Sequence, residues 1–177
     1  GDVNWGPLDF LVLDLPPGTG DVTLTLSQKM AITGAVVVTT PQAVATDDVF
    51  KPVSMAEKVS IPILGIVENM SYFIDPAGIR HELFGKGGGQ AVADFAKAPL
   101  LATLPIDPSV REWGDKGTPV TKAAPEGAAA ASFVALAEAL LKVVGAKAEA
   151  MAASDGDDFQ IDRSGGPGGK KRLPVAK

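Results

Sequence analysis

The sequence contains no cysteine, and this absence excludes several kinds of chemistry. None of its 177 residues can form a disulfide, which weakly agrees with a reducing compartment. Histidine is nearly absent too, because His81 is the only one. Since no cysteine or second histidine accompanies it, we interpret His81 as a solvated loop residue rather than a metal ligand.

Features of membrane and nucleic-acid proteins are also missing. No apolar run approaches the roughly 20 residues that a membrane-spanning helix needs. Residues 1–5 contain neither a basic segment nor an apolar signal core. The formal net charge is −5, and no basic stripe is visible in the sequence. We therefore expect a cytoplasmic protein that binds neither membranes nor nucleic acids.

The pattern of apolar residues predicts an α/β fold. Strands are expected at residues 9–15, 34–40, 62–68 and 99–104, and helices near 22–31, 44–59, 89–97 and 128–144. Strands separated by helices form parallel βαβ units, so a parallel sheet is predicted. The last helix should pack on this sheet and end at Gly145.

A change in composition divides the chain near residue 150. Residues 1–150 have the composition of a globular domain, whereas 151–177 are rich in Ser, Asp, Gly and, at the end, basic residues. Such a segment has too few apolar residues to offset the entropy that ordering costs. We expect 151–177 to be a disordered tail.

The most informative segment is residues 9–21, whose sequence is DFLVLDLPPGTGD. Phe10–Leu13 form a continuous apolar run, as in a strand that is buried on both faces. Asp14 stands where that strand should emerge from the sheet. A carboxylate in this position can reach a metal ion, as the acidic residue of a Walker B strand does.

The turn after Asp14 suits a phosphate group. Pro16 and Pro17 restrict φ, while Gly18 and Gly20 leave backbone N–H groups accessible to a phosphate. A γ-phosphate sensor at Gly18 would fit this chemistry. An ordinary exit from a strand into a turn is the alternative, because Asp is a common turn residue.

The segment DLPPGTGD at residues 14–21 resembles the switch II region of the Mrp/ApbC group of MinD-like P-loop ATPases, which carry or assemble iron–sulfur clusters. Four more segments follow in the order and at the spacing of that family: TTPQ (39–42), GIVENMSYF (65–73), FGKGGG (84–89) and LPIDP (104–108). The resemblance covers about residues 9–145. It implies a MinD-like P-loop NTPase fold that is incomplete at the N-terminus.

The resemblance implies a function as well. It predicts an ATP-binding iron–sulfur cluster carrier that uses Mg²⁺ and couples ATP hydrolysis to cluster transfer. The full-length protein would be a homodimer whose partners are apo iron–sulfur proteins. A MinD/ParA-like regulatory or positioning ATPase without a cluster is the alternative, and an inactive fragment is a third.

The resemblance also implies which residues bind the nucleotide: Asp14, Pro17, Gly18, Thr19, Gly20, Asn69, Pro105 and Asp107. Asp14 would hold Mg²⁺ through water. Asn69 follows a predicted strand, and its amide can donate to and accept from an adenine edge, which its neighbours favour over the alternative of a turn residue at the strand end. Pro105 and Asp107 could instead form a simple turn and a helix N-cap. Pro41 and Gln42 should line the nucleotide or partner face.

A phosphate-binding loop of the form G-x-x-x-x-G-K-[ST] is not present in the sequence. Residues 85–90 (GKGGGQ) lack its second Gly-Lys-[Ser/Thr], and we interpret Lys86 as part of a flexible glycine loop. In the family, the true loop lies upstream on a strand between the two that correspond to 9–15 and 34–40. We therefore expect a C-terminal part of a longer ATPase. Alone it should bind ATP weakly, and residues 9–15 should pair non-natively with 34–40 or stay loosely attached.

The chain departs from the family pattern at the cluster site. Many Mrp-like proteins have a C-x-x-C pair just after the ENMSYF segment. Asp75 and Gly78 occupy those positions here. Gly78 has no ligating group, and the oxygen of Asp75 is a poor match for an iron–sulfur cluster. No cluster ligands are predicted in this segment.

Overall fold

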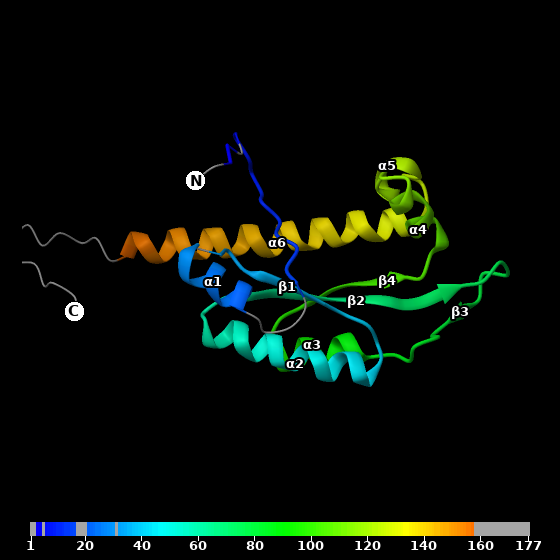
Figure 1. Cartoon of the computed structure of the whole chain (residues 1–177), viewed down its shortest axis with the longest axis horizontal. Helices are drawn as coiled ribbons and strands as arrows, with labels where there is room; N and C mark the ends of the chain where they lie inside the picture. The colour runs from blue at the N-terminus through cyan, green and yellow to red at the C-terminus, as the bar shows by residue number, and fades with distance from the viewer. Residues whose placement is uncertain (1–2, 5, 17–20, 31, 158–177) are drawn as a thin grey trace, which may run out of the picture. The chain divides into compact units, whose positions relative to one another are not determined.

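The computed structural model describes residues 3–4, 6–16, 21–30 and 32–157 (Figure 1). The chain divides into two compact units, Gly1–Val144 and Gly145–Lys177. The first unit contains the sheet and all the predicted site residues. In the second unit, the described residues continue helix α6 as far as Asp157.

The described elements alternate as the sequence predicts. The helices are α1 (Asp21–Lys29), α2 (Ala43–Lys58), α3 (Gly88–Ala96), α4 (Pro108–Asp115), α5 (Val120–Ala123) and α6 (Ala128–Asp157). The strands are β1 (Ala35–Thr39), β2 (Ile63–Ile74), β3 (Arg80–His81) and β4 (Leu100–Pro105).

Strand β2 is the centre of the sheet. It pairs in parallel with β1 on one side, where Val37 lies opposite Ile66, and with β4 on the other, where Ile66 lies opposite Leu100. The end of β2 turns back as a hairpin and pairs antiparallel with β3, Phe73 opposite His81. The parallel α/β sheet is therefore confirmed, with a short antiparallel extension that the sequence did not predict.

Helices α2 and α3 cover one side of the sheet, while residues 128–144 of α6 run along the other (Figure 1). The core between the sheet and helices α2 and α3 consists of Val53, Ile66, Val92 and Ala93. Ile66 and Val92 are fully buried, at 0% exposure. Burying an aliphatic side chain of this size contributes about 1.5–3 kcal/mol, so this layer holds the sheet and helices together.

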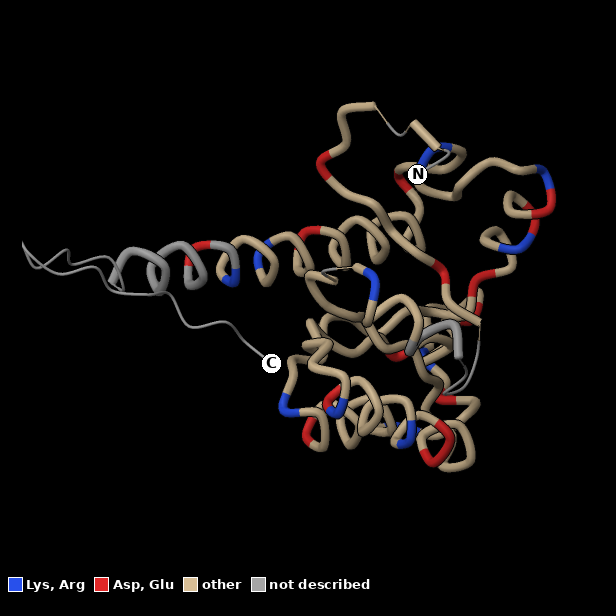
Figure 2. Tube along the Cα trace, turned by 60° about the vertical axis from the view of Figure 1, so that its left-hand side comes forward, with Lys and Arg blue, Asp and Glu red and all other residues tan. Residues whose placement is uncertain are grey.

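Charges of both signs are mixed over the molecule. Figure 2 shows Lys and Arg interspersed with Asp and Glu along the described chain. Helix α2 is an example, since Asp47 and Asp48 lie in the same helix as Lys51 and Lys58.

The strand expected at residues 9–15 does not form. These residues are irregular in the structure, and Phe10 and Val12 are 55% and 87% exposed. A strand needs a neighbour to take up its backbone N–H and C=O groups, and among the described residues β1 pairs with β2 alone. Residues 9–15 have the apolar content of a strand, but no described strand pairs with them.

One C-terminal expectation needs correction. Helix α6 does not stop at Gly145 but continues to Asp157. Residues 158–177 lie outside the described part of the chain. The stripe expected on this helix is partly present, because Phe133 and Leu136 are half-buried whereas Leu141 is 50% exposed.

The expectation that no segment is long and apolar enough to cross a membrane was also wrong. Within α6, Ala128–Lys147 has a mean hydropathy of 1.7 and meets that criterion by length and composition, alone among the described helices. Only 11% of the apolar window is buried. Core helices of soluble proteins pass the same test, so a single such helix is weak evidence for a membrane span.

Amide hydrogen exchange should be slow in strand β2 and fast in the apolar segment Phe10–Leu13. We expect the amide of Ile66 to exchange slowly, because β2 is paired on both sides and covered by the core. The amides of Phe10–Leu13 should exchange rapidly, because they are unpaired and exposed. Equal protection in a mass-spectrometric or NMR exchange experiment would contradict this fold.

Candidate functional site

The carboxyl ends of the three parallel strands meet at one edge of the sheet. Thr39 at the end of β1 lies opposite Glu68 of β2, which in turn lies opposite Thr103 of β4. Open parallel sheets bind ligands outside this edge. The structure thereby brings together three of the segments predicted as site residues: Thr39–Gln42, Asn69 and Pro105.

Asn69 lies in a bulge of β2. Glu68 pairs with Thr103 and Tyr72 with Pro105, so β2 has two residues more than β4 between these pairs. Met70 adopts a left-handed conformation there, with φ of 53°. The Met70 N–H donates to Asn69 Oδ1 at 2.9 Å. One lone pair of the amide oxygen therefore closes the turn, which leaves the Nδ2 donors of the half-buried Asn69 for another partner.

A buried carboxylate lies next to this bulge. Glu68 is only 3% exposed. Its Oε1 accepts a hydrogen bond from Ser71 Oγ at 2.5 Å, and its Oε2 accepts one from the Gly89 N–H at 2.6 Å. Because the two donors come from β2 and from the first turn of α3, the carboxylate joins the strand end to the helix start.

This network was not predicted from the sequence. The one available signal was a charged residue inside the apolar run of residues 63–68, followed twenty residues later by three consecutive glycines at 87–89. Nothing in either segment alone shows that they touch. Among described residues, no buried side-chain nitrogen or oxygen lacks a hydrogen-bond partner, so the network is fully satisfied.

The glycines at the start of α3 are there for close packing. A Cβ on Gly88 would lie 2.5 Å from the carbonyl oxygen of Pro41, and a Cβ on Gly89 would lie 2.7 Å from Glu68 Cβ. Our interpretation of a flexible glycine loop is therefore wrong for these two residues. Lys86 precedes them as an exposed side chain. Pro41 is buried under α3, so Gln42 alone of the predicted pair faces solvent.

The segment after β4 has a mainly structural role. The Ile106 N–H donates to the Tyr72 carbonyl at 2.6 Å and thus holds the end of β4 against β2. Asp107 is the N-cap of α4, and its Oδ1 accepts from the Ser109 N–H at 2.8 Å. Of the two alternatives weighed for Asp107, the structure supports helix capping.

Asp14 lies apart from a strand end. Its side chain is exposed within the irregular segment 6–16. Pro17, Gly18, Thr19 and Gly20 lie outside the described residues. The carboxylate is thus accessible to solvent, but its predicted place at the end of a β-strand is not observed.

The hairpin tip is organised by Asp75. Its Oδ1 accepts from the Ala77 and Ile79 N–H groups, each at 2.9 Å, and its Oδ2 lies 2.8 Å from His81 Nε2. The hydrogen bond from His81 lowers the pKa of the Asp75 carboxyl, and the bond from the Ile79 N–H lowers this pKa further. His81 is therefore not a free loop residue: it belongs to β3 and, at 44% side-chain exposure, is bonded to Asp75.

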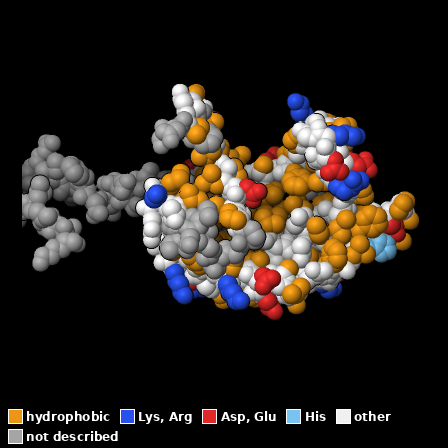
Figure 3. Space-filling view, viewed as in Figure 1, with side chains coloured by type: hydrophobic (Ala, Val, Ile, Leu, Met, Phe, Trp, Pro, Cys, Tyr) orange, Lys and Arg blue, Asp and Glu red, His pale blue; other side chains and the backbone are white. Residues whose placement is uncertain are grey.

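Apolar side chains surround this hairpin. Ile74, Ile79 and Leu83 are 48%, 57% and 59% exposed. Figure 3 shows hydrophobic side chains gathered beside the histidine at this end of the molecule. Nearby, the Arg80 guanidinium lies 3.8 Å from the centre of the Tyr72 ring, a cation–π contact.

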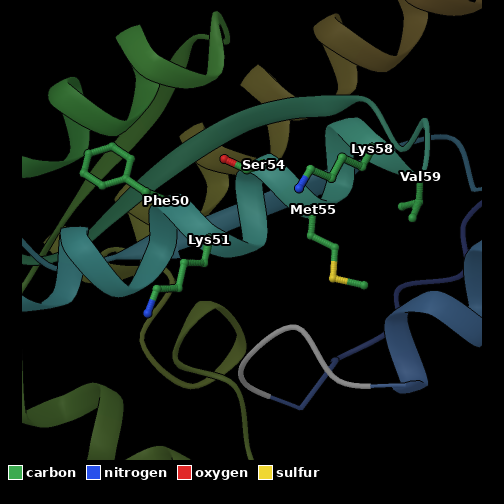
Figure 4. A pocket seen from close by; sticks show the side chains of 6 residues that line it. All are labelled: Phe50, Lys51, Ser54, Met55, Lys58 and Val59. Carbon is green, nitrogen blue, oxygen red and sulfur yellow. The ribbon is translucent and has the colours of Figure 1, made fainter.

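A groove lies on α2, and none of its lining residues belongs to the strand ends. It is lined by Phe50, Lys51, Ser54, Met55, Lys58 and Val59 (Figure 4). Five of these residues come from successive turns of α2, and Val59 follows directly after the helix. In the described part of the chain, no group of three or more His, Asp or Glu side chains could hold a metal ion.

Comparison with protein families decides the relationship. The family described as ParA, NUBPL iron-transfer P-loop NTPase, matches residues 1–141. The chain belongs to this family. The predicted Mrp-type relationship and the MinD-like P-loop NTPase fold are both confirmed.

Named relatives agree with this assignment. The chain is 52% identical over 148 residues to the iron–sulfur cluster carrier protein of Aquifex aeolicus, covering 81% of this chain and 40% of the relative. It is 50% identical over 135 residues to the protein of the same name from Escherichia coli, covering 76% and 37%. The chain thus spans about two fifths of the length of these relatives.

Solved structures show the same fold. The cell division ATPase MinD of Pyrococcus furiosus superposes with a TM-score of 0.61 at 30% identity, over 76% of this chain and 52% of that one. A nucleotide-binding protein from Archaeoglobus fulgidus, solved in complex with ADP, superposes with a TM-score of 0.56 at 45% identity, over 64% and 47%.

The contact between α3 and Glu68 can be tested with one methyl group. Gly89→Ala should lower the free energy of unfolding by about 1–3 kcal/mol, because the new Cβ overlaps Glu68 Cβ. Gly114→Ala is the matched control: nothing lies within 4 Å of its Cβ, and alanine favours a helix. Urea unfolding of both variants measures the difference. Equal stability of the two would contradict the close packing.

The hairpin hydrogen bond can be tested by titration. In an NMR titration, the pKa of Asp75 should lie below 3.8 in the native chain and rise in His81→Ala, while the Ile79 and Ala77 N–H groups keep it below 3.8. Because the folded-state pKa is the lower one, this stabilisation is complete above about pH 3.8 and is lost as the pH falls through the folded-state value. An unchanged pKa in His81→Ala would refute the pairing.

Proposed function

We propose that this chain is part of an ATP-binding iron–sulfur cluster carrier, in which ATP hydrolysis is coupled to cluster transfer. The observation that supports it most is the meeting of the β1, β2 and β4 ends at one edge, where Asn69 has free amide donors. The family and the names of its relatives favour a carrier over a MinD/ParA-like positioning ATPase without a cluster.

The nucleotide would lie along this edge. Asn69 Nδ2 would donate to the adenine edge, while its Oδ1 remains bonded to the Met70 N–H. The half-buried Pro105 would border the base from β4. Asp107 would contribute indirectly, by fixing the start of α4 behind that strand.

Mg²⁺ would be held by Asp14 through water. Its donor chemistry fits, since Mg²⁺ prefers carboxylate oxygens and retains several waters, and the side chain is exposed. Bound Mg²⁺ would neutralise phosphate charge. Pro17, Gly18, Thr19 and Gly20, which follow Asp14, would contribute backbone contacts to the phosphates.

The cluster would be cargo, and the residues of this chain do not fit it as ligands. The chain has no cysteine. At the tip of the hairpin, the Asp75 carboxylate is occupied by Ala77, Ile79 and His81, and Gly78 has no donor group. Any thiolates that hold a cluster would have to come from outside these 177 residues.

The assembly and its setting are part of the same proposal. A homodimer that delivers clusters to apo iron–sulfur proteins in the cytoplasm is what a carrier of this family would form. The exposed apolar side chains at the hairpin offer a surface on which such contacts could be made.

Replacement of Asp14 tests the nucleotide site. In the protein expressed from its complete coding sequence, Asp14→Asn should leave the melting temperature nearly unchanged and slow ATP turnover at least about tenfold, near 1.4 kcal/mol of barrier. Asp9→Asn is the matched control, because Asp9 is an exposed carboxylate in the same segment. Phosphate release would be measured for both. Unchanged turnover in Asp14→Asn would contradict the proposed role of Asp14 in binding Mg²⁺.

A further inference from the structure

A buried carboxylate without a cationic partner is costly, so the place of Glu68 in the fold calls for a physical explanation. Glu68 is 3% exposed, and its two recorded partners, the Ser71 hydroxyl and the Gly89 N–H, are both neutral. Removing a carboxylate from water carries a penalty of several kcal/mol, which apolar residues of similar volume avoid. The partial positive charge at the start of α3 offsets part of this penalty.

The geometry of the two hydrogen bonds suggests what the carboxylate does. The bond to Ser71 spans Asn69 and Met70, which lie in the stretch where β2 has two residues more than β4. The hydrogen bond therefore joins the two ends of the bulge, Glu68 before it and Ser71 after it. Met70 is held at φ of 53°, a conformation that costs a non-glycine residue about 1 kcal/mol or more and persists only when neighbouring contacts enforce it.

The second bond fixes the bulge relative to the rest of the edge. Gly89 donates to the other carboxylate oxygen, and the preceding Gly88 packs on the carbonyl of Pro41 after β1. Helix α3 is thereby clamped between two strand ends. A shift of Glu68 would be transmitted to the bulge on one side and to the segment after β1 on the other.

We infer that Glu68 is a positioning residue, whose buried carboxylate shapes the bulge that presents Asn69 to the nucleotide base. This inference rests on the proposed nucleotide site, and it adds the residue that sets the base preference of that site. Glu68 does not touch the nucleotide. It acts through the backbone of Asn69 and Met70, so its loss should affect recognition of the base more than affinity for the phosphates.

The test compares affinities for ATP and GTP in the protein expressed from its complete coding sequence. Calorimetry would give both dissociation constants for the native protein and for Asn69→Ala, Glu68→Ala and Ser71→Ala. We expect each variant to reduce the preference for ATP about fivefold to tenfold, the scale of one hydrogen bond. Glu68→Gln should retain most of the preference, because its amide can accept from Gly89 and donate to Ser71.

Two controls separate positioning from loss of stability. Val120→Ala removes buried volume in α5 at a residue outside the Glu68 hydrogen-bond network, and should lower the melting temperature without changing the ratio of the two affinities. In the double variant Glu68→Ala/Asn69→Ala, the second change should add nothing to the first, because both act on one contact.

The outcomes distinguish the two proposals. If Asn69→Ala reduces the ATP preference but Glu68→Ala and Ser71→Ala leave it at the native value, Glu68 has only a structural role. Additive effects in the double variant would overturn the inference in the same way. If the native protein does not prefer ATP and Asn69→Ala changes neither affinity, the nucleotide site itself is wrong, and the role of Glu68 falls with it.

Discussion

The structure depends on the pairing of β2 with every other strand in the described sheet. β1 pairs in parallel with its first half, β4 pairs in parallel with it as far as Tyr72, and β3 pairs antiparallel with its end. Since its interior residues Ile66 and Val67 are almost completely buried, β2 also supplies the centre of the core. The strand-end site and the hairpin are consequently two parts of one continuous backbone, separated only by the bulge at Asn69 and Met70.

Much of this architecture could be predicted from the sequence, because local patterns determine it. Residues 34–40 and 44–59 have clear strand and helix periodicities, and both elements form within one or two residues of the expected bounds. The continuation of β2 past Glu68 was not predictable in the same way. Polar residues interrupt the alternation there, and the chain stays extended because Tyr72 pairs with β4 while Phe73 and Ile74 pair with β3.

The errors share a physical cause, which is that a sequence pattern does not specify the partner. Residues 9–15 have the apolar content of a buried strand, but a strand also requires a paired neighbour. Gly145 resembles a helix stop, although one glycine costs a helix only about 1 kcal/mol and α6 continues through it. The Glu68 network was invisible because its second donor is 21 residues away in sequence.

The outer edge of β1 has a consequence for how the chain behaves at high concentration. Five residues with unpaired backbone groups, Ala35–Thr39, form this edge in the described structure, and Val38 is 57% exposed on it. Main-chain hydrogen bonding is indifferent to side-chain identity, so such an edge accepts any extended segment that fits its alternation. The same chemistry that would let a further strand complete the sheet therefore makes the uncovered chain prone to oligomerise through β1, at a rate that rises with its concentration.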